Sequence, residues 1–113
     1  EVFLSFNDEN DLTYGFLRLR KPSQNAHRPE ITHKTSIVRE LHVFGKAMGI
    51  GEQEEFSIQH QGIGKKLMMK AEEIAATDLS SDKLCVISGV GTREYYRKLN
   101  YKNNGPYMAK ELW

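Results

Sequence analysis

The chain has 113 residues, of which 39% are hydrophobic and 27% charged, and 16 Lys and Arg nearly balance 15 acids for a net charge of +1. This is the composition of one small globular domain, and no apolar run reaches the roughly 18 residues of a membrane-spanning helix. The single cysteine, Cys85, excludes an internal disulfide, a multi-cysteine zinc site and a cysteine-bound iron–sulfur cluster.

The ends and the charge distribution give further expectations. The N-terminal residues do not resemble a signal peptide, so we expect a cytoplasmic protein without membrane contacts. The chain starts at Glu1 and runs at once into apolar residues, so we expect a piece of a longer protein.

Residues 17–46 hold seven Lys and Arg against two acids, and residues 93–110 hold five against one. These two segments form either an ordinary solvated surface or a site for an anion such as a nucleotide or RNA.

The first half of the chain predicts three strands, at residues 2–6, 12–20 and 36–44, from alternation and β-branched or aromatic content. The polar cluster between the first two strands predicts a hairpin. Residues 21–35 are typical of an irregular connection, and the Gly- and Glu-rich residues 45–58 predict a long loop of the kind that is often functional.

The second half begins with an amphipathic helix, predicted to start at Gly62 and to end near residues 78–82. An apolar run at 84–87 predicts a strand buried on both faces, followed by a short helix at 91–99 and a last strand at 107–112. The sequence therefore predicts a mixed α/β (α+β) domain over residues 1–113.

The start of the predicted helix carries a candidate anion site. The first turn of a helix has unpaired N–H groups and a partial positive charge, and Gly62 and Gly64 have no Cβ to keep a diphosphate away from them. Lys65 adds a positive charge. The spacing is not that of a Walker A loop or of a dinucleotide-binding fingerprint. The structural alternative is that Gly62 turns the chain and Gly64 allows close packing of the helix.

Two short patterns resemble those of the GNAT acetyltransferases. Residues 59–64 resemble the Gln-x-x-Gly-x-Gly diphosphate-binding signature. Tyr96, Asn100 and Tyr101 resemble a Tyr-x-x-x-Gly-aromatic pattern, with Asn in the place of Gly, and Asn also tolerates positive φ. The resemblance implies a phenol near a thioester sulfur that donates a proton to the departing thiolate. We expect Tyr96 or its neighbour Tyr95 in this role, unless both only pack the short helix onto the sheet.

Four separated segments, residues 36–43, 59–62, 87–93 and 105–108, resemble more closely the family of Elongator catalytic subunits, in their acetyltransferase-like domain. The resemblance implies the GNAT fold, in which two parallel strands splay apart and acetyl-CoA places its pantetheine arm along the exposed strand edge. The residues implied in acetyl-CoA binding are Glu40, Leu41, His42, Val43, Gln59, Gln61, Gly62, Ile63, Gly64, Lys65, Tyr95 and Tyr96.

Some side chains have both a functional and a purely structural interpretation. Glu40 and His42 lie on one face of the predicted strand beside the thioester, where Glu40 is a candidate catalytic base or simply a solvated carboxylate. His27 and His33 lack further ligands at zinc spacing, so we expect no metal site. The basic stretch from Arg18 to Lys34 could contact tRNA phosphates.

The resemblance also implies parts that this chain lacks. The family carries a radical S-adenosylmethionine (SAM) domain with an iron–sulfur cluster and modifies the wobble uridine of tRNA with acetyl-CoA. We therefore expect this chain to be the acetyl-CoA-binding domain, with tRNA, the radical SAM domain and other Elongator subunits as partners. Two alternatives remain: a general GNAT N-acetyltransferase of proteins or small molecules, and a non-catalytic module that binds RNA or a protein.

Overall fold

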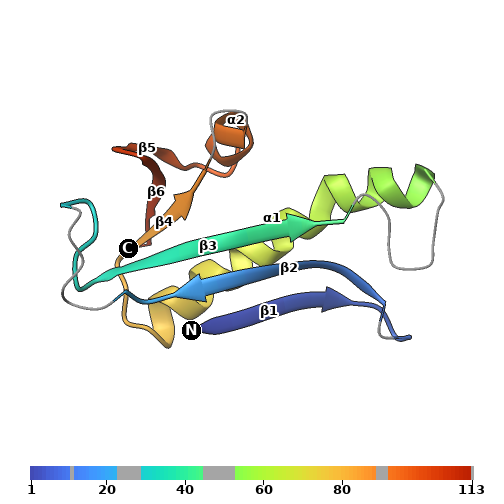
Figure 1. The fold of residues 1–113 in the computed structure, drawn as a ribbon, viewed down its shortest axis with the longest axis horizontal. Helices are drawn as coiled ribbons and strands as arrows, with labels where there is room; N and C mark the ends of the chain where they lie inside the picture. Colours follow the sequence, from blue (N-terminus) through green and yellow to red (C-terminus); the bar gives the residue numbers. More distant parts are fainter. Residues whose placement is uncertain (11, 23–28, 45–52, 89–91, 113) are drawn as a thin grey trace.

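The centre of the molecule is a six-stranded sheet in the order β1-β2-β3-β4-β6-β5 (Figure 1). The computed structural model describes residues 1–10, 12–22, 29–44, 53–88 and 92–112, with the backbone alone for residues 53–61. The pair β3–β4 is parallel, and the other four strand pairs are antiparallel. The elements are β1 (Val2–Asn7), β2 (Thr13–Arg20), β3 (Thr35–Val43), α1 (Gln53–Thr77), β4 (Lys83–Ile87), α2 (Arg93–Arg97), β5 (Lys102–Asn104) and β6 (Tyr107–Glu111).

The predicted mixed α/β class is confirmed, with one strand more than the sequence indicated. The additional strand, β5, has three polar residues and pairs with β6 across a turn at Gly105, whose φ is +62°. Such a strand has no apolar alternation, so only its partner reveals it. In the part of the chain that the structure describes, no helix is long and apolar enough to cross a membrane.

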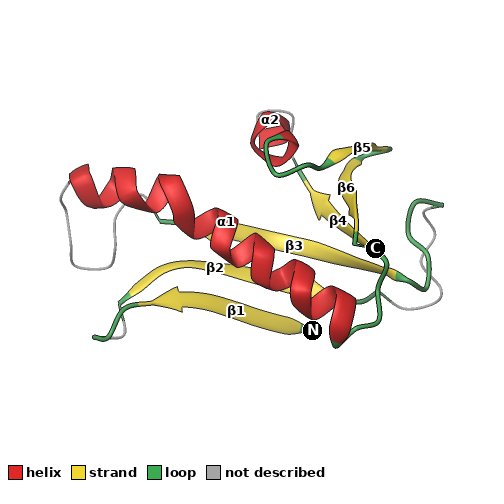
Figure 2. Cartoon of the chain, turned by 180° about the vertical axis from the view of Figure 1, so that it is seen from behind, coloured by secondary structure: helices red, strands yellow, loops and turns green. Residues whose placement is uncertain are grey.

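Helix α1 packs along one face of the sheet and, among the residues that the structure describes, provides five of the 13 buried residues of the main core cluster (Figure 2). The predicted apolar stripe is confirmed, because Ile63, Leu67, Ala71 and Ala75 are all buried. They meet buried residues of four strands, Leu17, Leu19, Val38, Leu84, Val86 and Met108. Burying this apolar surface at about 25 cal/mol per Å² is the main force that holds the helix to the sheet.

The opposite face of the sheet carries a row of aromatic rings. Phe3 stacks on Phe16 at 5.6 Å between ring centroids, and Phe16 stacks on His42 at 5.6 Å with an angle of 7° between the rings. On β3, Leu41 and Val43 pack toward the core beneath α1, so His42 between them faces away from the helix. The two faces of the sheet therefore differ: one holds the main core under α1, and the other carries this aromatic row over β1–β3 and a smaller buried cluster of Ile31, Ile37, Cys85 and Ala109.

The predicted start of the helix is wrong. Helix α1 begins at Gln53, so residues 53–58, expected in a loop, are helical, whereas residues 45–52 lie outside the described ones. The physical reason is that Gln and Glu are good helix formers and acids are favourable in a first turn. A glycine inside a helix costs about 1 kcal/mol, which is too little for Gly62 or Gly64 to break a helix that packs on a sheet.

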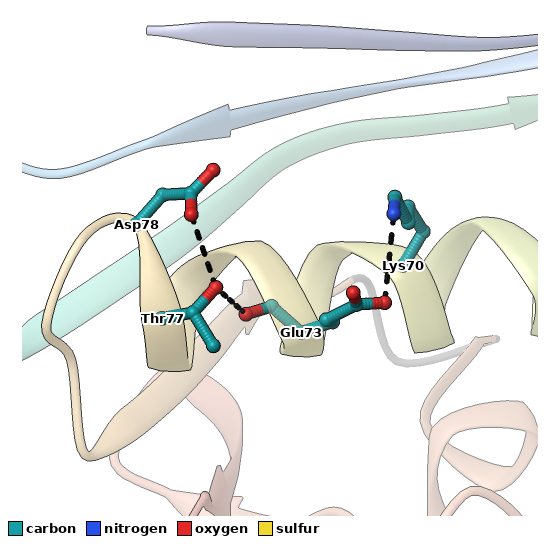
Figure 3. Close-up of polar contacts among 4 residues, drawn as sticks. All are labelled: Lys70, Glu73, Thr77 and Asp78. Atoms are coloured by element: carbon teal, nitrogen blue, oxygen red, sulfur yellow. Dashed lines mark hydrogen bonds and ion pairs between the residues drawn. The ribbon is translucent and has the colours of Figure 1, made fainter.

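The C-terminal end of α1 lies where the sequence indicated. The Thr77 hydroxyl donates to the Glu73 carbonyl oxygen at 2.7 Å and to Asp78 Oδ1 at 3.1 Å, and Lys70 forms an ion pair with Glu73 at 3.5 Å (Figure 3). Ser80 has a φ of +51°, which ends the helical path. The chain then enters β4, where Leu84, Cys85 and Val86 are buried, as predicted for a strand covered on both faces, whereas Ile87, the last residue of the predicted run, is 56% exposed.

The continuous helix gives a first prediction. A Cβ at Gly62 would have no heavy atom within 4 Å, so Gly62→Ala adds helix propensity without a clash and stabilises the ligand-free domain by about 0.5–1 kcal/mol. In a thermal unfolding experiment this raises Tm by roughly 2–5 °C. The control is Gly105→Ala, which lowers Tm because that residue has positive φ and its Cβ would overlap the Glu30 side chain. An unchanged or lower Tm for Gly62→Ala would contradict an unbroken α1.

Candidate functional site

Strands β3 and β4 separate partway along their length. Their parallel pairing covers residues 35–38 of β3 and ends at the pair Val38–Val86, whereas β3 continues to Val43. Beyond Val38, β3 pairs with β2 from Arg18–Glu40 to Gly15–Val43. In the described part of the chain, the edge of residues 39–43 that faces β4 therefore carries no strand. This is the splayed geometry that the resemblance implied. The Phe44 N–H donates to the Tyr14 carbonyl oxygen of β2, so alternation turns the backbone groups of His42 and Glu40 toward β2 and leaves those of Leu41 and Val43 on the open edge.

The far end of β3 meets both helices at one point. A Cβ placed on Gly64 would overlap the Tyr95 hydroxyl oxygen and lie 3.5 Å from Val43 Cγ2. Gly64 in α1, Tyr95 in α2 and Val43 in β3 are thus in mutual proximity beside the gap between β3 and β4. The absence of a side chain at Gly64 is what allows the Tyr95 hydroxyl to lie against α1. Three residues predicted for one site from separate segments are therefore brought together.

The two neighbouring tyrosines differ in their surroundings. Tyr95 is 37% exposed, whereas Tyr96 is 7% exposed and belongs to the core. Burial raises the pKa of both phenols, and burial together with Tyr95 raises the pKa of Tyr96 to about 12. Both hydroxyls thus stay protonated at neutral pH and can donate hydrogen bonds. Tyr95 is the one whose hydroxyl lies at the meeting point of α1 and β3.

Helix α2 ends in a motif that the sequence indicated through Asn100. This residue has a φ of +74°, which confirms the expectation that Asn replaces Gly in the left-handed conformation. The Asn100 N–H donates to the Arg97 carbonyl at 3.0 Å, and the Tyr101 N–H donates to the Tyr96 carbonyl at 3.1 Å. This is the Schellman arrangement, and it turns Tyr101 back against Tyr96 at 6.1 Å between ring centroids.

A polar cluster that the sequence analysis missed anchors this turn to α1. The Tyr101 hydroxyl donates to Glu72 Oε2 at 2.8 Å, and Lys110 Nζ lies 3.2 Å from Glu72 Oε1. Burial, with the Glu72 carboxylate next to it, raises the pKa of Tyr101 far above its usual value. The contacts join residues 72, 101 and 110, so no local pattern could reveal them. Their effect is to fix the distance between α1 and the end of α2.

Glu40 and His42 lie apart from the tyrosines. Glu40 Oε1 forms an ion pair with Arg18 Nε at 3.3 Å, with both side chains about half exposed, and His42 stacks on Phe16. Strand alternation places both on the face opposite α1. A base at Glu40 would therefore act from the other side of the splayed strand than a proton donor at Tyr95 or Tyr96.

The anion site expected at a helix start requires a correction. The N–H groups of residues 62–64 lie in the third turn of α1, where a helix uses such groups for its own hydrogen bonds. They are not the free amides of a first turn on which the prediction depended. The side chains of Gln59 and Gln61 lie outside the described ones, whereas Ile63 is buried and Lys65 is exposed.

Metal and thiol chemistry find little support at this site. Among the described residues no three His, Cys, Asp or Glu side chains lie together as metal ligands, and His27 lies outside that part of the chain. Cys85 is fully buried in β4, and burial raises the pKa of its thiol to about 11. The expectation that the thiol is buried is confirmed.

Comparison with known proteins assigns this arrangement to a class. Over 98% of this chain and 68% of the other, the fold superposes on Tetrahymena GCN5 with a TM-score of 0.65 at 13% identity. An acetyltransferase from Bacillus cereus superposes over 97% of this chain and 71% of its own, with a TM-score of 0.67 at 17% identity. The splayed strands, the long helix and the short tyrosine-bearing helix define a GNAT acetyltransferase fold.

Closer relatives define the family. The chain is 51% identical to Elongator complex protein 3 of Danio rerio over 100% of this chain and 21% of the relative. It is 47% identical to the tRNA uridine(34) acetyltransferase of Dehalococcoides mccartyi, over 99% and 25%. The archaeal Methanocaldococcus infernus Elp3 superposes with a TM-score of 0.81 at 48% identity, over 96% and 26%. No family model matches the chain. The chain belongs to the Elongator complex protein 3 family and spans about a fifth to a quarter of the length of the curated relatives.

The contact between Gly64 and Tyr95 gives a second prediction. Gly64→Ala places a methyl group where the Tyr95 hydroxyl lies, so the ring moves toward solvent and the pKa of Tyr95, now raised by burial, falls toward its usual value. Difference spectroscopy of tyrosine ionisation measures this change, with Tyr95→Phe identifying the signal. An unchanged ionisation curve in a folded Gly64→Ala variant would show that Tyr95 does not lie against Gly64.

Proposed function

We propose that this chain is the acetyl-CoA-binding acetyltransferase domain of an enzyme that modifies the wobble uridine of tRNA. The observation that carries the proposal is the end of the β3–β4 pairing at Val38, with Gly64 and Tyr95 meeting beside the resulting gap. Free backbone groups on a strand edge suit the amides of a pantetheine arm, since an extended ligand pairs with a strand edge as another strand would.

The pantetheine arm would lie along residues 40–43, and the diphosphate would lie near residues 59–65. In the ligand-free structure the latter are helical, so binding through the amides of Gly62, Ile63 and Gly64 requires α1 to begin later in the bound state. The two glycines suit such a change, because glycine loses the most conformational entropy in a helix and leaves it at the lowest cost. Exposed Lys65 would then add its charge beside the diphosphate.

The tyrosines would act on the thioester. A phenol that stays protonated at neutral pH can donate its proton or a hydrogen bond to sulfur as the carbon–sulfur bond breaks. The family pattern favours Tyr96, whereas the contact with Gly64 favours Tyr95 as the residue that borders the gap. Burial of Tyr96 against Tyr101 supports a second task for Tyr96, which is to hold α2 in place.

Glu40 would serve the other side of the reaction. Its carboxylate faces away from α1 and forms an ion pair with Arg18, so it would accept a proton from a group bound on the face of the sheet opposite α1.

The rest of the proposed reaction belongs to parts outside this chain. We propose that the longer protein supplies a radical SAM domain with its iron–sulfur cluster and S-adenosylmethionine, binds tRNA, works in the cytoplasm and assembles with other Elongator subunits. The residues of this chain do not fit such a cluster, because it needs several thiolates and the one cysteine is buried. The domain would thus supply the acetyl group and not form the new bond to uridine by itself.

Binding of acetyl-CoA is the third prediction and the main test of the proposal. Calorimetric titration of the chain with acetyl-CoA should give binding that Gly64→Val weakens at least tenfold, since a branched side chain fills the space between α1 and Tyr95. Lys70→Gln, on the exposed side of α1 and paired with Glu73, is the matched control and should bind as the unchanged chain does. No heat with millimolar acetyl-CoA and a folded domain would refute the proposal.

The fourth prediction separates the two tyrosines. Loss of a proton donor typically lowers the rate by about 10²-fold or more, so Tyr95→Phe should lower kcat for thioester hydrolysis with little change in KM. Tyr96→Phe should lower the Tm of the domain in addition to the rate, if the main task of the Tyr96 side chain is to hold α2 in place. The measurement is thiol release with and without tRNA. Equal rates for both variants and the unchanged chain would exclude a phenol as the proton donor.

The same assay distinguishes the acceptor. Thiol release that a lysine peptide accelerates but tRNA does not would favour a protein N-acetyltransferase.

A further inference from the structure

Three tyrosine rings connect the gap between β3 and β4 to a buried contact on α1. Tyr95 lies edge-on to Tyr96 at 5.1 Å between ring centroids, with an angle of 81° between the rings. Tyr96 lies edge-on to Tyr101 at 6.1 Å and 68°. Exposure falls along this series, from 37% at Tyr95 to 7% at Tyr96 and 2% at Tyr101. We refer to the three residues as the tyrosine row. Its exposed end is the proposed proton donor, and its buried end reaches α1.

Charged side chains hold the buried end of the tyrosine row. The Tyr101 hydroxyl donates to Glu72 Oε2 at 2.8 Å, and Lys110 Nζ donates to Glu72 Oε1 at 3.2 Å. Lys110 Nζ also lies over the Tyr101 ring, 5.7 Å from its centroid. The side chains of Lys110 and Glu72 are only 28% and 19% exposed, so water screens this ion pair less than one at the surface. A hydrogen bond to a carboxylate is stronger than one between neutral groups, so Glu72 holds Tyr101 in one orientation.

The two ends of the tyrosine row contact α1 at separate points. The Tyr95 hydroxyl lies against Gly64, and the Tyr101 hydroxyl binds Glu72. These two residues of α1 are eight positions apart, about 12 Å along the helix axis. Helix α2 has only five residues, and a helix of that length is not stable by itself. Its position relative to α1 therefore depends on these two contacts and on the ring packing between them.

A change at the buried end of the tyrosine row moves its exposed end. Protein interiors are close-packed, so Tyr101 cannot tilt without displacing the ring of Tyr96. The Tyr101 N–H also donates to the Tyr96 carbonyl at 3.1 Å, which couples the backbones of the two residues. Tyr95 is the neighbouring residue in the same short helix, so a shift of Tyr96 carries the Tyr95 hydroxyl away from Gly64. The orientation of Tyr101 thus determines where the Tyr95 hydroxyl lies.

We propose that Glu72 is a positioning residue for the thioester chemistry, and that through Tyr101 and Tyr96 it holds the Tyr95 hydroxyl beside the gap between β3 and β4. In this role Glu72 transfers no proton and acts only through the orientation of other side chains. The assignment rests on the proposed function and deepens it, because it adds a residue on which the proton donor depends. Such placement matters for the rate, since misplacing a reacting group by about 1 Å can lower the rate about 10²-fold.

The test uses three variants of the contact and two controls. Tyr101→Phe removes the hydroxyl and keeps the ring, Glu72→Ala removes the acceptor, and Glu72→Gln keeps an oxygen that can accept the hydrogen bond. Glu73→Ala is the matched control, because Glu73 is the next residue of α1 and also pairs with a lysine, but is 63% exposed (Figure 3). Ala75→Gly is the stability control, because it destabilises α1 in the core beside the turn at Ser81.

The first measurement is thiol release from acetyl-CoA, well below the Tm of every variant. Tyr101→Phe and Glu72→Ala should lower kcat about tenfold or more with little change in KM, and Glu72→Gln should keep most of the rate. Glu73→Ala should have the kcat of the unchanged chain, and Ala75→Gly should lower Tm but not kcat. If Ala75→Gly lowers kcat as much as Tyr101→Phe does at an equal loss of Tm, Glu72 is a stabilising contact only and the inference is overturned.

A double-mutant cycle tests whether Tyr101 acts through Tyr95. In the Tyr95→Phe background, Tyr101→Phe should lower kcat little further, because the hydroxyl that it positions is already absent. The same fold loss of kcat in both backgrounds would show that the two residues act independently, which the inference does not allow.

Tyrosine ionisation tests the positioning without acetyl-CoA. Burial raises the pKa of Tyr95, so this pKa should fall toward its usual value in Tyr101→Phe as the hydroxyl leaves Gly64, with Tyr95→Phe identifying the signal. An unchanged Tyr95 ionisation in a folded Tyr101→Phe variant would overturn the inference. The proposed function fails separately, if the unchanged chain binds no acetyl-CoA, and the ionisation measurement then still decides whether Glu72 and Tyr101 position Tyr95.

Discussion

The early end of the β3–β4 pairing is the constraint on which the site depends. Parallel strands bond evenly along their shared length, yet here the bonds stop at Val38 and Val86 while β3 runs on to Val43. β3 stays in place because β2 pairs with it along that stretch and because Leu41 and Val43 pack beneath α1. A strand edge can thus remain open without loss of the sheet.

The second element of the site, α2, is too short to keep its own position. It has five residues, and contacts of the helix itself and of the turn after it fix its place. Within the helix the Tyr95 hydroxyl lies against Gly64, and after it Tyr101 reaches Glu72 on the same long helix. The half-buried ion pair with Lys110 adds β6 to this cluster. One carboxylate on α1 therefore sets the width of the gap between the two helices.

Helix α1 combines two opposed requirements. Its stripe of buried side chains favours an unbroken helix, whereas the proposed diphosphate site needs free amides at residues 62–64. Glycine satisfies both requirements, because it destabilises the helix by only about 1 kcal/mol and has no Cβ that would keep a ligand away from the amides. A residue that favours the helix more strongly would stabilise the ligand-free domain and oppose the bound state.

The sequence by itself determined the mixed α/β class, the buried stripe of α1, the doubly covered strand at Cys85 and the left-handed Asn100, because periodicity and φ preference are local properties. It misplaced the start of α1, since glycines that look like a helix boundary are tolerated once the helix packs on a sheet. Short β5 escaped notice because its three residues are polar and show no apolar alternation, and the cluster around Glu72 did so because residues far apart in the chain create it. Only the tertiary structure decided that Glu40 and the tyrosines lie on opposite faces, since a strand's pattern shows alternation but not which face meets the helix.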